Sequence, residues 1–337
     1  MKDAFFIHDG NLQLFTALLV VRIKEIESKP FLFVKQDLGK KNNEKLAEYF
    51  TVETDSEGIE GNFDNVFFFT TAFPEKEVFD AIRCKKRILV YEGLTTYYTE
   101  FWASLYDAWT VASFDEILLP VPSLVEDRRL ANYRELDVKG YFRNRRNLEE
   151  FVKDINAIWG LDDNEIDRVL KTQKDIIYFD RYFEHVPVET ILKNSAHRLM
   201  IGAVGRMSDE MLVKLHPHDT MEYYLDDLGI NSLTDKLPNE LIVANMMLDD
   251  ANLKNRRLTF FMFNSSAAVN YYSFFGIEKF NIICLGGLLN IYGTNQEKAL
   301  VSFKHTKLLL DKLEDISEVK VFYPHNIEEL YKLREVL

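Results

Sequence analysis

The sequence is poor in the residue types that mark several classes of protein. Its 337 residues include two cysteines, Cys84 and Cys284, which stand far apart in the chain. We therefore expect two ordinary thiols in a reducing compartment rather than a disulfide framework or a zinc site. Glycine (14) and proline (8) are sparse beside 26 phenylalanines and 16 tyrosines, which excludes a fibrous or an intrinsically disordered chain.

Basic residues and long hydrophobic runs are also scarce. The 41 lysines and arginines are outnumbered by 54 aspartates and glutamates, which gives a net charge of −13. Such a chain is a poor nucleic-acid binder, and an anionic ligand would need a local positive pocket. The apolar run at 14–21 is shorter than the roughly 20 residues that span a bilayer, and no signal-peptide pattern precedes it. We expect a cytoplasmic protein, at most peripheral at the inner face of the cell membrane.

Several catalytic motifs are missing as well. The chain has no G-x-G-x-x-G or Walker loop, no D-x-D triplet of the kind that metal-dependent nucleotide-sugar enzymes use, and no G-x-S-x-G nucleophile. His216 and His218 form an H-x-H pair without a further ligand at a recognisable spacing. We therefore expect neither a bound metal nor a covalent nucleophile.

Hydrophobic runs of strand length alternate with longer segments of helical periodicity. The predicted strands lie at 4–7, 31–34, 65–70, 87–91 and 116–120 in the first half, and at 175–179, 199–204, 212–215, 258–263, 281–285 and 319–322 in the second. The predicted helices lie at 11–27, 43–50, 75–83, 96–112, 148–159 and 164–172. This alternation predicts parallel sheets that are covered by helices on both faces.

The pattern divides the chain into two halves. We predict a Rossmann-like N-terminal domain at 1–170, a second Rossmann-like domain at 171–325 and a short C-terminal helix at 326–337. Two doubly wound α/β domains facing a central cleft form the GT-B arrangement of nucleotide-sugar glycosyltransferases, although some epimerases and periplasmic binding proteins share it. We therefore predict an α/β fold of the GT-B type, in which the loops at the strand ends decide the chemistry.

Two segments have an ordinary interpretation. The arginine-rich stretch at 126–147 could hold an anionic acceptor or touch a membrane surface, but its interleaved acids favour a solvated, ion-paired face. The aromatic stretch at 271–275 is expected in a core or at a subunit face rather than beneath a bound sugar.

The K-x-H-P stretch from Lys214 to Pro217 is the most specific motif. A predicted strand ends at Leu215, and Pro217 restricts His216 to an extended backbone at the edge of the sheet. An imidazole there can donate a proton or a hydrogen bond to a phosphate, and Lys214 can add positive charge. A capping or otherwise structural histidine is the alternative.

Three further strand ends and helix starts carry polar groups. Glu92, which precedes a glycine, can take a proton from an incoming hydroxyl or can close a turn. Ser265 and Ser266 can bind an anion at a helix N-terminus or can merely cap that helix. Glu240 can accept hydrogen bonds from two ribose hydroxyls or can complement the helix dipole.

Together these motifs resemble those of bacterial sialyltransferases, in particular the lipooligosaccharide and capsule group of glycosyltransferase family 52 and the related polysialyltransferases. That group has an acidic-acidic-Gly motif, a His-Pro motif and a Ser-Ser motif in this order. The matching stretches are Tyr91-Glu92-Gly93, His216-Pro217 and Ser265-Ser266. The opening stretch IHDGNLQL, at 7–14, looks like the family's first strand and the glutamine-containing turn that follows it.

The resemblance implies a role for each matched residue. Glu92 would be the general base on the acceptor hydroxyl. His216 would bind and neutralise the leaving CMP phosphate, with a second role as general acid. Ser265 and Ser266 would hydrogen-bond that phosphate, and Glu240 would hold the cytidine ribose.

The remaining matched residues divide between the two substrates. Lys214 would join the CMP site in the C-terminal domain, whereas Asp9, Asn11 and Gln13 would lie on the acceptor or base side in the N-terminal domain. One position departs from the family, which usually has an acidic residue where Tyr91 stands. Either Glu92 has taken over as base, or another carboxylate such as Asp9 serves, or the catalytic step is impaired.

The resemblance implies an inverting, metal-independent sialyltransferase that needs no cofactor. It would move sialic acid from CMP-sialic acid to a terminal sugar, with galactose expected, of a capsular or lipooligosaccharide glycan. Its partners would be this donor and an oligosaccharide acceptor, with no nucleic acid; a lipid-linked acceptor, a peripheral membrane contact and a homodimer stay open. The alternatives are a transferase for another CMP-activated ulosonic acid and a non-catalytic nucleotide- or glycan-binding protein.

Overall fold

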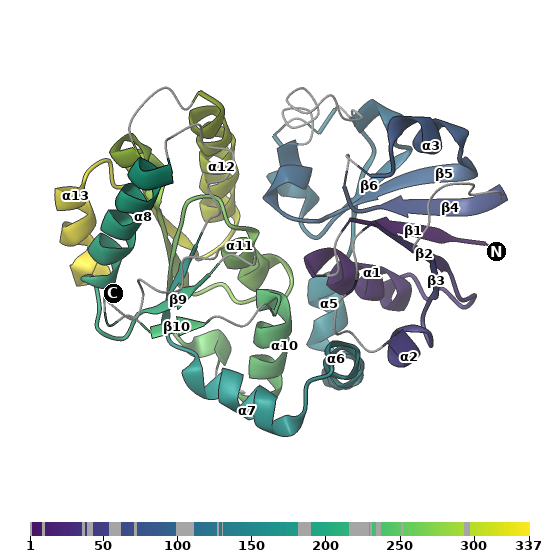
Figure 1. Cartoon of the computed structure of the whole chain (residues 1–337), viewed down its shortest axis with the longest axis horizontal. Helices are drawn as coiled ribbons and strands as arrows, with labels where there is room; N and C mark the ends of the chain where they lie inside the picture. Colours follow the sequence, from purple (N-terminus) through teal and green to yellow (C-terminus); the bar gives the residue numbers. More distant parts are fainter. Residues whose placement is uncertain are drawn as a thin grey trace. The chain divides into compact units, whose positions relative to one another are not determined.

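The computed structural model describes most of the chain, which forms two compact units (Figure 1). The described residues are 2–8, 11–35, 38, 43–53, 62–70, 73–98, 111–126, 128–129, 131–180, 190–215, 229, 231–233, 237–250, 253–292 and 297–337. The first unit comprises Met1–Ile166, Leu237–Leu248 and Ser273–Phe275. The second comprises Asp167–Lys236, Asp249–Tyr272 and Gly276–Leu337.

The first unit is built on a seven-stranded parallel sheet. Its strands are β1 (Ala4–Ile7), β2 (Phe31–Val34), β3 (Thr51–Glu53), β4 (Asn62–Phe68), β5 (Arg83–Val90), β6 (Glu116–Leu119) and β7 (Tyr133–Glu135). They lie in the order β3-β2-β1-β4-β5-β6-β7, and neighbouring strands are parallel. The winding direction switches between β1 and β4, which makes this a Rossmann-like sheet.

Helices and 3-10 turns surround this sheet. They are α1 (Leu12–Ile23), α2 (Asn43–Leu46), α3 (Lys76–Ala81), η1 (Leu94–Tyr98), η2 (Val111–Ser113), η3 (Pro122–Leu124), α5 (Val138–Arg143), α6 (Arg145–Trp159) and the start of α7 (Asp163–Thr172), together with α10 (Asn239–Asp249) from later in the chain. Figure 1 shows α1 and α3 on opposite sides of the sheet.

Phenylalanines build the core on both faces of the first sheet. Phe6 stacks on Phe68 with ring centroids 5.3 Å apart, and Phe68 lies 5.0 Å from Phe79 of α3. Phe5 stacks on Phe67 at 4.5 Å. Because successive residues of a strand point to opposite faces, the Phe-Phe pairs of β1 and β4 fill both layers at once.

The second unit repeats this winding with six strands. They are β8 (Ile176–Phe179), β9 (Leu212–Lys214), β10 (Asn231–Leu233), β11 (Leu258–Met262), β12 (Phe280–Cys284) and β13 (Lys320–Phe322). They lie in the order β10-β9-β8-β11-β12-β13, with parallel neighbours. The switch in winding falls between β8 and β11, as it does between β1 and β4 in the first unit. The predicted α/β class with two Rossmann-like sheets is thus confirmed.

The helical elements of the second unit include the C-terminal helix. They are α8 (Thr190–Gly205), η4 (Leu253–Asn255), α11 (Ser266–Ser273), η5 (Leu285–Tyr292), α12 (Glu297–Ile316), α13 (Ile327–Lys332) and η6 (Leu333–Val336). Leu330 of α13 is fully buried in the core that α8 and the sheet form. The terminal helix at 326–337 is therefore part of the second unit. Among the helices described in either unit, none combines the length and the apolar content needed to cross a membrane.

One predicted strand is wrong, and three strands were not predicted. Residues 199–204 lie in α8, where Met200 and Ile201 are buried side by side while Leu199 is 57% exposed. A short apolar run fits a buried helix as well as a strand, and here the helix forms. The missed strands β3, β7 and β10 are three-residue strands at sheet edges, too short to give a hydrophobic pattern.

The unit boundaries also differ from the prediction. The first unit breaks off at Ile166, near the predicted limit at 170, but it also includes 237–248 and 273–275 from within the predicted second domain. The packing of Phe274 and Phe275 explains why residues 273–275 belong to the first unit. Phe274 stacks on Phe15 of α1 at 6.2 Å, and Phe275 stacks on a phenylalanine of α5 at 5.5 Å. The aromatic stretch at 271–275 is therefore core, as expected, and is no sugar platform.

Candidate active site

Polar side chains follow two strands of the first sheet where those strands end. β1 ends at Ile7 and is followed by His8, and β5 ends at Val90, two residues before Glu92. Only β4 separates β1 from β5 in the sheet. Because parallel strands end at the same edge, both loops lie at the carboxyl edge near the switch between β1 and β4. Ligands bind at this position in sheets of this type.

Gln13 joins these two loops. It lies in the first turn of α1 and is only 7% exposed. Its Oε1 accepts a hydrogen bond from the backbone N–H of His8 at 2.6 Å, and its Nε2 donates to Oε2 of Glu92 at 2.7 Å. One side-chain amide therefore reaches from the end of β1 to the carboxylate that follows β5.

Glu92 is also held by its own loop. Its backbone N–H donates to Oγ1 of Thr96, in η1, at 3.1 Å. Gly93 between them has a φ of 150°, which side chains with a Cβ rarely adopt, so the tight turn expected behind Glu92 is confirmed. The half-buried carboxylate is thus fixed in place at the edge of the sheet.

Tyr91 has a different environment from its neighbour Glu92. Its side chain is fully buried, with ring centroids 5.5 Å from Tyr97 and 5.7 Å from Phe274. An ionised carboxylate in this aromatic surrounding would lose its hydration without a compensating charge. Tyr91 is therefore part of the aromatic core, and Glu92 is the half-buried carboxylate of this pair.

The second unit carries charged residues at the corresponding edge. Lys214 ends β9 and is 7% exposed, and Asp180 follows β8 and is 5% exposed. The two backbones meet, because the N–H of Asp180 donates to the carbonyl of Lys214 at 3.0 Å. A lysine and an aspartate, both buried, thus lie at the carboxyl ends of the adjacent strands β9 and β8, near the switch between β8 and β11.

Ser265 and Ser266 lie at the start of α11, after β11. Oγ of Ser265 accepts a hydrogen bond from the N–H of Ala267 at 3.2 Å, so Ser265 does cap this helix. Capping uses the oxygen as an acceptor, which leaves the O–H bond as a donor for an anion at the same helix end. Both serines are half-buried rather than enclosed in the core.

Glu240 lies in the first turn of α10 and is 4% exposed. This helix segment belongs to the first unit and not to the predicted CMP-binding domain. The neighbouring Asn239 is 8% exposed, and its buried Nδ2 has no hydrogen-bond partner in the described part of the chain. A buried donor without an acceptor costs roughly 1–3 kcal/mol, so such a group in a native structure requires an explanation.

Two of the predicted site residues, Asp9 and His216, lie outside the described residues, and their roles stay predictions. Asn11 occupies the N-cap position of α1, where its side chain makes no capping hydrogen bond. Within the described ranges, no three His, Cys, Asp or Glu side chains gather in a group that could hold a metal ion. The independence from metal also stays a prediction.

The cysteines are free thiols, as expected. Burial raises the pKa of Cys284 to about 12, and its Sγ contacts the carbonyl of Phe263 at 3.4 Å. Burial also raises the pKa of Cys84 above its ordinary value. A nucleophilic cysteine needs a depressed pKa, so neither thiol has the environment of a nucleophile.

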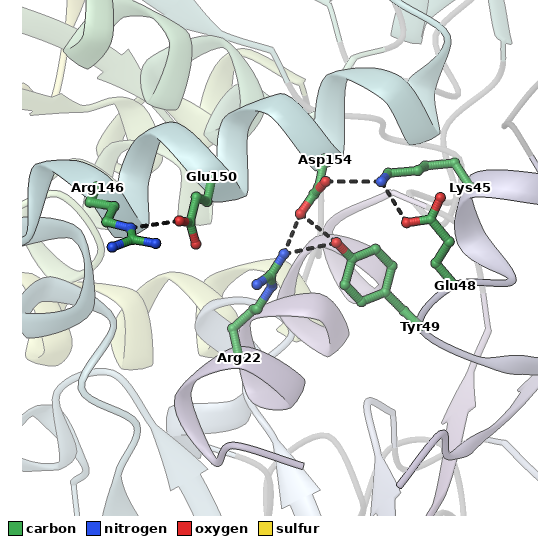
Figure 2. Close-up of polar contacts among 7 residues, drawn as sticks. All are labelled: Arg22, Lys45, Glu48, Tyr49, Arg146, Glu150 and Asp154. Atoms are coloured by element: carbon green, nitrogen blue, oxygen red, sulfur yellow. Dashed lines mark hydrogen bonds and ion pairs between the residues drawn. The ribbon is translucent and has the colours of Figure 1, made fainter. Parts of the chain in front are cut away.

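The arginines at the start of α6 are ion-paired, as expected. Arg145 contacts Glu149 and Arg146 contacts Glu150, each at 2.8 Å, and Figure 2 shows the second pair. Arg145 also donates to two backbone carbonyls in the last turn of α10, at 3.0 and 2.8 Å. The prediction of an ion-paired face is confirmed for these two residues.

A cavity of about 490 Å³ lies in the first unit, away from the predicted site. Its lining includes Asp3, Asn65, Lys86 and Glu116, toward the amino-terminal ends of β1, β4, β5 and β6. None of the predicted site residues that the structure describes lines it.

Sequence reasoning missed Thr96, Asp180 and Asn239. Asp180 follows a hydrophobic strand directly, so the rule that found Glu92 would have found it too. Thr96 and Asn239 had no such signal, because a hydrogen bond to a loop N–H and the burial of an amide are properties of the folded chain.

The sequence matches no protein-family model and no curated protein. The structure is similar to that of an α/β-galactoside α-2,3-sialyltransferase from a luminous marine bacterium, Photobacterium phosphoreum. The likeness covers 98% of this chain and 99% of that chain, with a TM-score of 0.54 and 10% sequence identity.

Two other solved structures are similar at lower scores. A GT-B domain of a sialyltransferase from Photobacterium damselae has 13% identity, covers 96% of this chain and 100% of that chain, and has a TM-score of 0.48. The wall teichoic acid polymerase TagF has 10% sequence identity and a TM-score of 0.43, and the likeness covers 99% of this chain and 87% of that chain. The first of the three likenesses and the two Rossmann-like sheets show that the chain shares its α/β fold with a bacterial α-2,3-sialyltransferase.

Proposed function

We propose that the chain is an inverting, metal-independent sialyltransferase, which moves sialic acid from CMP-sialic acid to a terminal sugar of a capsular or lipooligosaccharide glycan. The observation that carries this proposal is the carboxylate of Glu92, held by Gln13 at 2.7 Å at the carboxyl edge of a Rossmann-like sheet. The likeness in fold to a sialyltransferase over 98% of the chain supports the reaction class.

The proposed chemistry is one direct displacement. Glu92 accepts the proton of the acceptor hydroxyl while the hydroxyl oxygen forms a bond to the anomeric carbon of sialic acid. The bond between that carbon and the phosphate oxygen breaks, and CMP leaves with the electron pair. A single displacement inverts the anomeric centre, so the β-linked donor yields an α-linked product.

The leaving phosphate gains negative charge, and fixed donors must stabilise it. We assign this role to Lys214, to the hydroxyls of Ser265 and Ser266, and to His216. The helix N-terminus after β11 adds backbone N–H groups that favour an anion. The backbone bond from Asp180 to Lys214 ties the end of β9 to the end of β8 and so helps to fix the backbone that carries the lysine.

We assign the cytidine ribose to Glu240 and Asn239. Glu240 supplies acceptor oxygens and Asn239 supplies an amide donor, and a pair of sugar hydroxyls needs both kinds of group. The buried Nδ2 of Asn239 supports this assignment, because a bound hydroxyl oxygen would satisfy it.

The proposal is tested with a panel of donors. The purified chain is incubated with CMP-sialic acid, and separately with a CMP-activated eight-carbon ulosonic acid, each with and without a galactoside acceptor. We expect CMP release from CMP-sialic acid to rise about tenfold or more with acceptor, and the acceptor to gain the mass of one sialic acid. The rate should be unchanged by EDTA.

Other outcomes would replace the proposal. Turnover of the eight-carbon donor alone would make the chain a transferase for a different ulosonic acid. CMP binding without turnover of either donor would make it a nucleotide-binding protein. Loss of activity in EDTA with recovery on added metal would contradict the metal-independent mechanism.

A further inference from the structure

The amide of Gln13 can make its two hydrogen bonds in one orientation only. Its Oε1 faces the backbone N–H of His8, which is a donor, at 2.6 Å. If the amide were rotated by half a turn, its NH2 group would face the N–H of His8, which is also a donor. Its oxygen would then face the carboxylate of Glu92, which is also an acceptor. The bond at His8 therefore forces Nε2 to point at the carboxylate, where it lies 2.7 Å from Oε2 of Glu92.

This geometry selects the position of the Glu92 carboxylate. The bond from Nε2 holds Oε2 of Glu92 in one place at the end of β5. Because Gln13 is 7% exposed and lies in a helix, its side chain has little freedom of its own. The carboxylate is thus tied to the end of β1 through one buried, rigid group.

We propose that Gln13 is a positioning residue of the transfer reaction, acting through Glu92 and touching neither the donor nor the acceptor. This inference rests on the proposed function, in which Glu92 is the base. A well-placed base contributes roughly 10²–10⁴-fold to a rate, and a loosened carboxylate loses a part of that factor. Loss of the bond should therefore lower kcat and leave the affinity for CMP-sialic acid unchanged.

The first test replaces Gln13 with a side chain of the same length that cannot hydrogen-bond. Gln13→Met should lower kcat by about 10- to 100-fold with KM for CMP-sialic acid within about twofold. Thr16→Val is the matched control, because Thr16 is fully buried one turn further along α1 and donates to the carbonyl of Leu12 at 2.9 Å. Equal losses of kcat in both variants would indicate a merely structural role and overturn the proposal.

The second test is a double-mutant cycle with Glu92→Gln. If Gln13 acts through Glu92, adding Gln13→Met to Glu92→Gln should change the residual CMP release by less than about twofold. A full further loss in the double variant would show that Gln13 acts independently, which contradicts the inference. Should Gln13→Met fail to fold, Gln13→Glu replaces it, since that variant keeps an acceptor for His8 but opposes two carboxylates.

The two proposals fail in different ways. If Glu92→Gln retains the wild-type rate, Glu92 is not the base, and the proposed mechanism falls together with this inference. If Glu92→Gln is inactive while Gln13→Met and Gln13→Glu keep the wild-type kcat, the proposed mechanism stands and only the role of Gln13 is wrong.

Discussion

At the carboxyl end of β5, two adjacent residues have opposite environments. Tyr91 is enclosed by aromatic rings, whereas Glu92 is half-buried and held by Gln13 and Thr96. Of the two side chains, only that of Glu92 is partly exposed. The tyrosine belongs to the core, and Glu92 is the residue to which we assign the base.

The base assignment makes a direct prediction for Glu92. Glu92→Gln keeps the shape of the side chain but removes its ability to accept a proton, so we expect transfer to fall by at least about 10²-fold. The affinity for CMP, measured by calorimetry, should change by less than about twofold. Tyr91→Phe is the control, because it removes only a hydroxyl from a buried ring beside the site. Normal transfer by Glu92→Gln would move the base to another carboxylate, with Asp9 next in line.

Asn239 allows a prediction in which stability and binding change in opposite directions. Asn239→Leu removes a buried donor that has no acceptor, so the unliganded protein should be as stable as the wild type or more stable. Binding of CMP should weaken by about tenfold, because about 1.4 kcal/mol of hydrogen bonding to the ribose is lost. Thermal unfolding and calorimetry measure the two effects.

Asn245 of the same helix is the matched control for Asn239. Its amide exchanges hydrogen bonds with Asn156 at 2.8 and 3.0 Å, and both side chains are buried. Asn245→Leu should therefore lower the unfolding temperature and leave CMP affinity unchanged. A destabilised Asn239→Leu with normal CMP binding would make Asn239 a structural residue like Asn245.

Residue types at strand ends could be predicted, but their partners could not. Glu92 and the two serines stand where the sequence placed them, one residue or a few beyond a hydrophobic run. The bond from Gln13 to Glu92 joins positions that are far apart in the chain, and no local pattern encodes it. The resemblance of the opening stretch placed Gln13 on the acceptor or base side, but it did not predict the hydrogen bond to Glu92.

At the scale of elements, a polar network ties α1 and α2 to α6. Figure 2 shows Asp154 of α6 contacting Arg22 of α1, Lys45 of α2 and Tyr49, which follows α2. Lys45 lies 3.1 Å from Asp154 and 2.6 Å from Glu48. Since α1 also carries Gln13, this network holds the helix on which Gln13 lies.

The charge of Asp154 makes this network sensitive to acid. Burial alone would raise the pKa of Asp154, but hydrogen bonds from Tyr49 and Lys45, with the charges of Lys45 and Arg22, outweigh it and leave the pKa below its usual value. The pKa of Asp154 is lower in the folded protein than in the unfolded chain, where it is near 3.9, so the ionised carboxylate stabilises the fold at a pH above that value. This stabilisation is lost as the pH falls through the pKa of the folded state. Acid should therefore weaken the attachment of α6.

Asp154→Asn should lower the free energy of unfolding at pH 7 by about 1–3 kcal/mol, because three donors lose a charged acceptor. Below pH 4 the difference between variant and wild type should shrink, since the wild-type carboxylate then gains a proton. Urea unfolding at both pH values measures this. Glu150→Gln, on the same helix with an exposed partner, should have a much smaller effect than Asp154→Asn at either pH, because water screens an exposed ion pair. A constant difference at both pH values would contradict the role of the charge.

Helices and strands were predictable where the hydrophobic pattern fitted only one type of secondary structure. The strands at 4–7 and 31–34 have the predicted bounds, because their four-residue runs are bordered by polar residues and turns. The run at 199–204 failed because its apolar residues fill a helix face, and only the length of α8, from Thr190 to Gly205, reveals the helix. The short edge strands β3, β7 and β10 form by pairing with longer neighbours.

At the scale of the whole molecule, the sequence predicts the two sheets, but it does not predict which residues pack into the core of each unit. The alternation of strands and helices repeats in both halves, so two sheets of the same winding are its direct consequence. Phe274 and Phe275 lie in the sequence between α11 and β12 of the second unit, yet their rings pack in the first unit. Such packing depends on shape in the folded chain, and the hydrophobic pattern shows only that both residues are buried.

This membership predicts which half of the protein a mutation weakens. Phe274 is fully buried, between Phe15 of α1 and Tyr91 next to Glu92. Phe274→Ala should cost about 3–5 kcal/mol, as expected for the loss of a buried aromatic ring. In hydrogen exchange, protection should fall in β1, α1 and β5 of the first unit and be retained in β8 and β11.

Phe261→Ala is the matched control, because Phe261 is fully buried in the core of the second unit. It should weaken protection in β8 and β11 and leave β1, α1 and β5 unchanged. The two variants also separate stability from catalysis, since Phe274 packs against Tyr91, and Tyr91 precedes Glu92, the proposed base. Phe274→Ala should therefore lower kcat even at temperatures where the protein stays folded, because the loop that holds Glu92 loses its packing. Loss of protection in the second unit alone would contradict the assignment of residues 273–275 to the first.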